Sequence, residues 1–148
     1  MPWGYDHSSI NDTERWIHEI VPDIWDSQKG YEFVIVNAKD DRVKSGCCSE
    51  QLDLNGKQAN IAYWVRTDAT GRGIATYACH FLIQYGLREL DLEIIRVIPS
   101  TKNIESKKVA KKLPYASIEL VKNGFKIRDP ISDALIYKIT RTSYGAIQ

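Results

Sequence analysis

The sequence has few cysteines, almost no net charge and no long apolar run. Three cysteines in 148 residues cannot form a disulfide framework, which favours a reducing compartment, and we expect the cytoplasm. A net charge of +1 gives no reason to expect nucleic acid or an anionic membrane as a partner. No apolar run is long enough to span a bilayer, and the N-terminus lacks the apolar core of a signal peptide. Repeats and low-complexity segments are also absent, and no pattern of residues predicts a metal site.

What the sequence does contain is typical of a folded domain. Hydrophobic residues make up 43% of the chain and charged residues 26%, as in a soluble globular protein. A length of 148 residues is ordinary for one domain, so we expect a single domain over residues 1–148.

The N-terminal part predicts an irregular entry at Met1–Gly4 and then a helix. The helix is expected to begin at Ser9 or Asn11, with Glu14 at the capping-box spacing from Asn11. Pro22 should kink or split this helix, and Gly30 is the expected stop.

Alternating and β-branched residues predict strands after this helix. Asn55-Gly56 is a strong signal for a type I′ hairpin. Within the second strand, Gly46 predicts either a β-bulge or a point where another group packs closely against the backbone. A polar turn at Arg128–Pro130 should join the last two strands. The expected strands are 31–36, 42–54, 58–65, 93–98, 117–127 and 134–139.

Two helices are predicted within this pattern. The first runs from Gly73 to Leu90, and strand–helix–strand at this spacing makes the strands on either side of it parallel. The second runs from Asn103 to Leu113, where Pro114 ends it. The apolar stripe predicted for the first helix comprises Ile74, Tyr77, Ala78, Phe81, Leu82, Tyr85 and Leu90. The fold class is therefore α/β (α+β), with helices packed on a mixed sheet.

The pair Gly71 and Gly73 stands between a strand and a helix. Both glycines can take positive φ and allow the backbone to approach a ligand closely. The free N–H groups at the start of the following helix favour an anion, and a diphosphate is the natural occupant. The loop is not a nucleotide P-loop, because no Lys-Ser/Thr pair follows, and Thr76 replaces the third glycine of a dinucleotide fingerprint.

The ordered motifs resemble the coenzyme-A-binding core of the GNAT acetyltransferase superfamily, in its RimJ/RimL-like subgroup. The resemblance covers about four fifths of the chain and implies a sheet with splayed parallel strands, apparently without the family's N-terminal strand. The motifs are Tyr63-Trp64-Val65, Gly71-Arg72-Gly73-Ile74-Ala75-Thr76, Asn103-x-x-Ser106 and Ala110-Lys111-Lys112-Leu113, followed by Lys122, Asp133 and Tyr137.

The resemblance implies acetyl-CoA as cofactor and assigns residues to it. Pantetheine amides would bond the strand edge, with the Val65 N–H as oxyanion donor, and the loop would hold the diphosphate. Asn103 would bond the pantetheine arm as well as cap its helix. Ser106 would be the general acid, or else only a polar residue of the first helical turn. The implied cofactor-binding set is Tyr63, Trp64, Val65, Gly71, Arg72, Gly73, Ile74, Ala75, Asn103 and Ser106.

No general base is identified. Phe125 and Asn60 occupy positions at which relatives carry glutamate. Glu119 lies one position away from the glutamate of the family's Glu-Gly pair. His80 is more consistent with a structural role, and neither His7 nor His18 belongs to a motif. Buried structural thiols explain Cys47-Cys48 better than an acyl-enzyme does.

Without an evident base, the acceptor is expected to be the N-terminal α-amine of a protein or peptide, or a small, weakly basic amine. At pH 7 an α-amine gives up its proton at a cost of about 1.4 kcal/mol, against about 4.6 kcal/mol for lysine. The expected function is N-acetyl transfer to a primary amine in a ternary complex, and the alternative is a non-catalytic acyl-CoA-binding module. Strand 31–36 would lie at an open edge, which predicts a homodimer through this edge or the helix beside it, with Trp3, Trp16 and Trp25 as cover or interface core.

Overall fold

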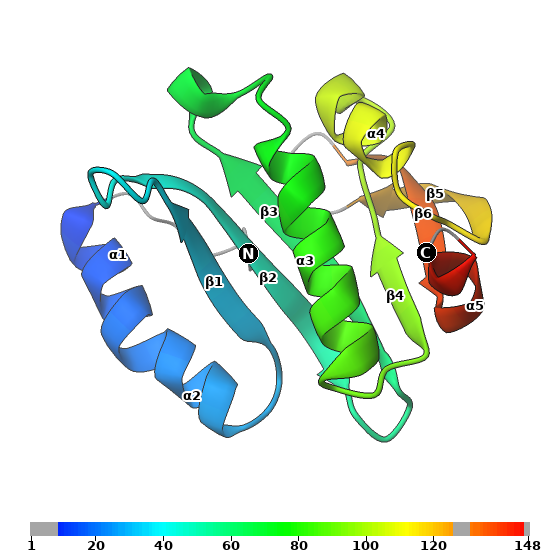
Figure 1. The fold of residues 1–148 in the computed structure, drawn as a ribbon, viewed down its shortest axis with the longest axis horizontal. Helices are drawn as coiled ribbons and strands as arrows, with labels where there is room; N and C mark the ends of the chain where they lie inside the picture. Colours follow the sequence, from blue (N-terminus) through cyan, green and yellow to red (C-terminus); the bar gives the residue numbers. More distant parts are fainter. Residues whose placement is uncertain (1–8, 126–130, 147–148) are drawn as a thin grey trace.

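A computed structural model describes residues 9–125 and 131–146 (Figure 1). The expectations for the Met1–Gly4 entry, Trp3, His7 and the Arg128–Pro130 turn lie outside the described residues. None of the helices in the described ranges is long and apolar enough to cross a membrane.

The N-terminal helical segment is divided into three pieces. Helix α1 spans Ile10–Arg15, a π-helical stretch spans Trp16–Ile20, and α2 spans Val21–Asp26. Pro22 lies at the start of α2, so the predicted split is confirmed. Proline has no N–H to donate to the preceding turn. The chain is accordingly wound as a wider π-helical turn just before it.

The start of this segment decides between the two predicted positions, and its end differs from the prediction. The N-cap is Ser9, whose hydroxyl accepts from the Asp12 N–H at 3.2 Å, which confirms the start at Ser9; the alternative, a capping box at Asn11, is wrong. Gly30 does not end the helix, because Gln28 takes the left-handed conformation at φ 54°. Gly30 is instead buried at the start of the sheet, where a side chain would collide with the carbonyl oxygen of Ser49.

The sheet has six strands in the order β1-β2-β3-β4-β6-β5. Helix α3, Ile74–Arg88, connects β3 to β4, and these two strands are parallel as predicted. All other neighbours are antiparallel, so the sheet is mixed and the expected fold class is confirmed. The strands span Tyr31–Val36, Val43–Asp53, Gln58–Val65, Ile94–Val97, Ser117–Phe125 and Ser132–Thr140.

The predicted hairpin between β2 and β3 is present, but it is not type I′. Asp53 pairs with Gln58 across the loop, and the Asp53 carboxylate accepts from the Gly56 N–H at 2.8 Å. The left-handed residue is Lys57 at φ 51°, and the described glycines with positive φ do not include Gly56. The aspartate side chain stabilises a longer turn than the Asn-Gly pair predicts.

Helix α3 buries a face rotated from the predicted stripe. Tyr77 is 67% exposed and Phe81 37% exposed, because the helix packs on β2 and β3 through a neighbouring row. Phe81 and Tyr85 instead lie on the flank of α3, where they contact Phe33 with ring centroids 5.2 and 5.5 Å apart. The buried row comprises Ala78, Cys79, Leu82, Ile83, Gly86 and Leu87.

Aromatic rings join the N-terminal helices to this core. Trp25 of α2 lies 4.7 Å from Tyr31 and 5.5 Å from Phe33, measured between ring centroids. Phe33 in turn contacts the flank of α3, so α2 and α3 share one face of the sheet, as Figure 1 shows. Trp25 therefore covers the side chains of β1 on this face, as one reading of the sequence expected.

The C-terminal part closes the sheet with two strands and two short helices. Helix α4 spans Ile104–Ala110 and so ends three residues before the predicted Leu113, and α5 spans Arg141–Gly145. Lys122 of β5 pairs with Asp133 of β6 at 3.0 Å. Tyr137 is buried in the core, with its ring 5.2 Å from that of Tyr115.

Candidate cofactor site

The parallel strands β3 and β4 separate halfway along β3. Their pairing ends at Ile61 opposite Val97, whereas β3 stays paired with β2 as far as Val65. After Val97 the chain follows β6 instead: the Pro99 carbonyl accepts from the Leu135 N–H, and the Thr101 N–H donates to the Asp133 carbonyl. Residues 62–65 of β3 therefore have no β4 partner.

The backbone groups on this unpaired edge can be assigned by alternation along the strand. The Arg66 N–H donates to the Lys44 carbonyl of β2 at 3.0 Å. Because successive residues of a strand direct their N–H and C=O groups to opposite sides, those of Val65 and Tyr63 point toward the β4 side. The structure thus brings the predicted Val65 N–H to the unpaired edge. Trp64 has its polar backbone groups directed at β2, and its indole packs against Gly46.

This close contact confirms the predicted role of Gly46. A Cβ at this position would collide with the indole ring of Trp64, and the β1, β2 and β3 registers are regular on both sides of it. Gly46 is therefore a point of close approach and not a bulge.

The glycine loop lies at the same end of the sheet as this edge (Figure 1). Gly71 and Gly73 have φ of 74° and 78°, and no atom lies within 4 Å of the position a Cβ would take. Gly73 caps α3 without a side-chain acceptor, so the N–H groups of the first turn, which includes Ile74 and Ala75, receive no cap. Arg72 is exposed beside them. The open backbone and the helix N-terminus together suit a diphosphate.

An ion pair precedes the glycine loop. Asp68 accepts from both Arg66 Nε, at 3.1 Å, and Arg66 Nη2, at 3.0 Å. Asp68 lies on the short 3₁₀ turn η2, Thr67–Ala69, and Arg66 is the residue before it; both side chains are about half exposed. Exposed pairs contribute little to stability, so its effect is to orient the turn.

Helix α4 brings the second set of predicted residues to the same end. Asn103 is its N-cap and accepts from the Ser106 N–H at 3.0 Å, which confirms the predicted capping role. The Ser106 hydroxyl lies 2.8 Å from the Tyr63 hydroxyl. Asn103, Ser106 and Tyr63 therefore form one connected group between α4 and β3. Their roles toward a cofactor stay predictions.

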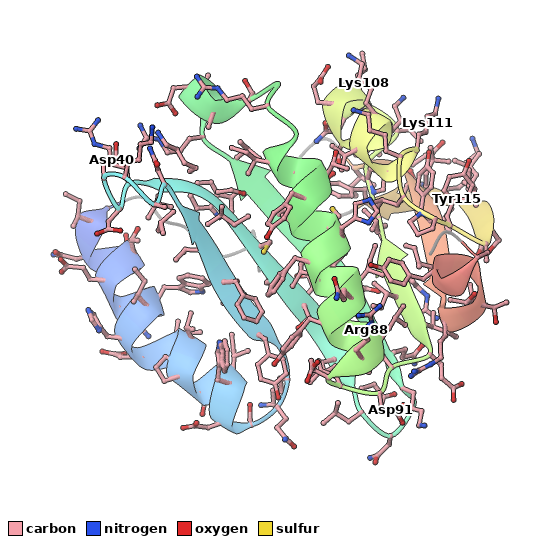
Figure 2. All side chains as sticks on the ribbon, in the orientation of Figure 1. Asp40, Arg88, Asp91, Lys108, Lys111 and Tyr115 are labelled. Atoms are coloured by element: carbon pink, nitrogen blue, oxygen red, sulfur yellow. The ribbon has the colours of Figure 1, made fainter. Side chains whose placement is uncertain are left out.

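The lysines of α4 differ in their surroundings. Lys108 pairs with Glu105 of the same helix at 2.7 Å. Lys108 and Lys111 point away from the sheet in Figure 2, as expected of a solvated face. Lys107 is half-buried.

The positions where relatives carry a base do not supply one here. Asn60 donates to the side chain of Gln51 at 2.6 Å, which uses its amide in a structural contact. Phe125 ends β5, Glu119 is exposed on β5, and His80 is half-buried on α3.

One titratable residue was missed by the sequence reasoning. Glu32 is half-buried on β1 and lies in register with Cys48 and Ala62, on the sheet face away from α3. Burial raises the pKa of the Glu32 carboxyl, and Glu50 adds to the rise. The available signal was a single charged residue in an otherwise apolar strand. Glu32 lies two strands from the unpaired edge of β3.

Cys47, Cys48 and Cys79 form no disulfide and are all buried, which confirms the structural interpretation of Cys47 and Cys48. Burial raises the pKa of Cys47 to about 11 and that of Cys48 to about 12. Burial also raises the pKa of Cys79 on α3. A thiol held neutral at pH 7 is a poor nucleophile, so none of the three is suited to an acyl-enzyme.

Together these features fit coenzyme A. An unpaired strand edge offers backbone donors and acceptors to pantetheine amides, and the open glycine loop offers N–H groups to a diphosphate. Such a split sheet beside a glycine loop defines a domain that holds an extended, anionic cofactor. The chain belongs to the GNAT acetyltransferase family: the family profile described as acetyltransferase (GNAT) domain matches residues 1–115. Members of this family use acetyl-CoA.

Individual relatives agree with this assignment. The chain is 26% identical over 93 residues to a Bacillus subtilis protein named "Putative ribosomal N-acetyltransferase YdaF", covering 63% of this chain and 51% of that protein. The chain thus spans about half the length of this relative.

Solved structures share the fold. Mycobacterium smegmatis RimJ in complex with CoA-disulfide superposes with a TM-score of 0.78 at 21% identity, covering 88% of this chain and 62% of that one. Vibrio cholerae spermidine N-acetyltransferase SpeG gives a TM-score of 0.78 at 14% identity, covering 93% and 79% of the two chains.

Proposed function

We propose that this protein transfers the acetyl group of acetyl-CoA to a primary amine in a ternary complex. The observation that carries the proposal is the unpaired edge of β3 at residues 62–65, which lies beside the open glycine loop. Acetyl-CoA supplies an activated thioester when bound. The protein supplies a strand edge, a helix N-terminus and a hydroxyl group at the places where such a substrate needs them.

The Val65 N–H is proposed to stabilise the negative charge that develops on the thioester oxygen. Its direction toward the β4 side is fixed by strand alternation. A donor of this kind contributes on the order of 3 kcal/mol to the transition state. Ser106 is proposed to protonate the leaving sulfur, and Asn103 to hold both the helix start and the pantetheine arm.

Direct transfer is favoured over an acyl-enzyme because all three thiols are buried with raised pKa values. The proposed acceptor is the α-amine of a protein or a small, weakly basic amine. Relatives with names pointing to ribosomal proteins and to spermidine support both kinds. Since Asn60 and Phe125 supply no base, an amine that is partly neutral at pH 7 suits the site best.

The test is coenzyme A release with an amine panel. Purified protein is given acetyl-CoA and peptides with varied N-termini, spermidine or aminoglycosides, and free thiol is followed over time. Steady thiol release that depends on one amine class, with the acetylated product seen by mass spectrometry, supports the proposal.

A second candidate function is a non-catalytic acyl-CoA-binding module. The amide contact between Asn60 and Gln51, at a position where relatives place a base, favours it. Tight coenzyme A binding by calorimetry without turnover of any amine would establish this alternative.

We further propose that the protein works in the cytoplasm and as a homodimer. Three buried cysteines that form no disulfide are typical of a reducing compartment. Strand β1 is the last strand at one end of the sheet within the described residues, and an edge strand is a template for pairing with a second copy.

A further inference from the structure

A hydrogen bond between two hydroxyls crosses the split in the sheet. Tyr63 belongs to β3, which stays with β2, whereas Ser106 belongs to α4, which follows β4. Their hydroxyl oxygens are 2.8 Å apart, and the Ser106 carbonyl oxygen lies 3.4 Å from the Tyr63 hydroxyl. The two sides of the split are thus linked by side chains where the strands themselves no longer pair.

Tyr63 is directed to this place by the register of the sheet. Tyr63 is in register with Cys47 and Phe33, and Phe33 contacts α3, so all three side chains lie on the α3 face. The Tyr63 ring is half-buried there. Burial raises the pKa of its phenol, and Cys79 of α3 adds to the rise. The hydroxyl therefore keeps its proton throughout the neutral range.

Either hydroxyl could donate at this distance, and the acidity of the two groups favours Tyr63 as the donor. The carbonyl at 3.4 Å is near the limit of a hydrogen bond, whereas the Ser106 oxygen at 2.8 Å is at the ideal O–H···O distance. A phenol is the stronger acid of the two hydroxyls and hence the better donor. With Tyr63 donating, the hydrogen of Ser106 is left for another acceptor.

We propose that Tyr63 is a positioning residue that directs the Ser106 hydrogen toward the leaving sulfur. The inference rests on the proposed acetyl transfer. Ser106 gives its hydrogen to the sulfur as the C–S bond breaks and the C–N bond forms. It regains one, through water, from the proton that the amine nitrogen releases. Tyr63 keeps its own proton, and its bond to the Ser106 oxygen sets the geometry.

A double-mutant cycle tests this role. Tyr63→Phe removes only the hydroxyl and is expected to lower kcat about fivefold or more, the effect of one lost neutral hydrogen bond, with KM for acetyl-CoA within twofold. In the Ser106→Ala background the same substitution is expected to have no further effect, because the group that Tyr63 orients is gone. Tyr85→Phe, which removes a hydroxyl from the aromatic cluster on the same face, should leave kcat unchanged.

The outcomes separate the two proposals. An active wild-type protein in which Tyr63→Phe acts equally in both backgrounds, or not at all, overturns the positioning role alone. A wild-type protein that turns over no amine overturns the proposed function, and the positioning role with it. Coenzyme A affinity measured by calorimetry for all four proteins of the cycle, expected within twofold, shows that the substitutions leave the fold intact.

Discussion

At the scale of single residues, Gly73 carries the clearest conformational requirement. Its φ of 78° is strained for any residue with a Cβ, although no atom lies near the position of that Cβ. Gly73→Val should shift the loop and the first N–H groups of α3, and so weaken coenzyme A binding at least tenfold in calorimetry. Gly145→Val is the matched control, since Gly145 also has open space but no positive φ. Unchanged affinity in Gly73→Val would refute this placement of the diphosphate.

The buried thiols make a prediction about stability at high pH. The pKa of Cys47 rises from 9.0 to about 11 on folding, so the folded state holds this proton more tightly than the unfolded chain. The resulting stability is complete below pH 9 and is lost as the pH rises toward 11. Each pKa unit of this rise corresponds to about 1.4 kcal/mol in the free energy of unfolding.

Cys47→Ala tests this linkage through the free energy of unfolding in urea. The variant is expected to cost stability at pH 7, where it leaves a cavity, and to cost about 2 kcal/mol less at pH 10.5. A cost that is the same at both pH values would show that the thiol is not protected by burial. In the native protein, all three thiols should also resist alkylation at pH 8 until denaturant is added.

At the scale of elements, the caps of α4 and α5 offer a matched pair. Asn103 caps α4 beside the site, and Thr140 caps α5, at the far end of β6. Each change to alanine should cost about 1 kcal/mol of stability. Only Asn103→Ala is expected to weaken coenzyme A binding and lower kcat as well. Equal kinetic effects of the two variants would leave Asn103 with a capping role alone.

Elements with a strong local signal were predictable from sequence. The strand Tyr31–Val36 matches its predicted bounds, and α3 starts after Gly73 because glycine alone readily takes that conformation. The stripe of α3 was right for Ala78 and Leu82, which are buried, and wrong for Tyr77 and Phe81. The small residue Gly86 lets the neighbouring row of the helix approach the sheet. When a helix has two adjacent rows of apolar residues, their spacing alone does not show which row faces the sheet.

The site was only partly predictable for a related reason. Motif spacing placed Val65, Gly73 and Ser106 on the correct elements. The hydroxyl contact between Tyr63 and Ser106 joins residues 43 positions apart, and no sequence period encodes it. The split of the sheet likewise depends on Pro99 and the chain after it pairing with β6, which is a tertiary preference.

At the scale of the whole molecule, the two ends of the sheet differ in structure. The end of β3, the glycine loop and α4 form the candidate site (Figure 1). At the opposite end, where Figure 2 labels Asp91, this residue pairs with Lys57 at 2.8 Å and with Arg141 at 2.9 Å. These pairs link the β2–β3 hairpin, the α3–β4 connection and α5. Because their side chains are exposed, they add little stability, and the backbone pairing of β3 with β4 keeps this end of the sheet closed.

The edge formed by β1 leads to the prediction about assembly. Because the Arg66–Lys44 hydrogen bond fixes the alternation, the backbone of Gly46 bonds β3, and Val34 opposite it directs its N–H and C=O groups outward. Val34 is also 65% exposed.

Light scattering at tens of micromolar should therefore give a homodimer. Val34→Lys, which adds a charge to this edge, should yield monomers without loss of folding. Leu120→Lys makes the same change on β5, at the opposite edge, where Leu120 is 53% exposed, and should leave the dimer intact. A monomeric wild-type protein, or dissociation by Leu120→Lys alone, would show that β1 is not the interface.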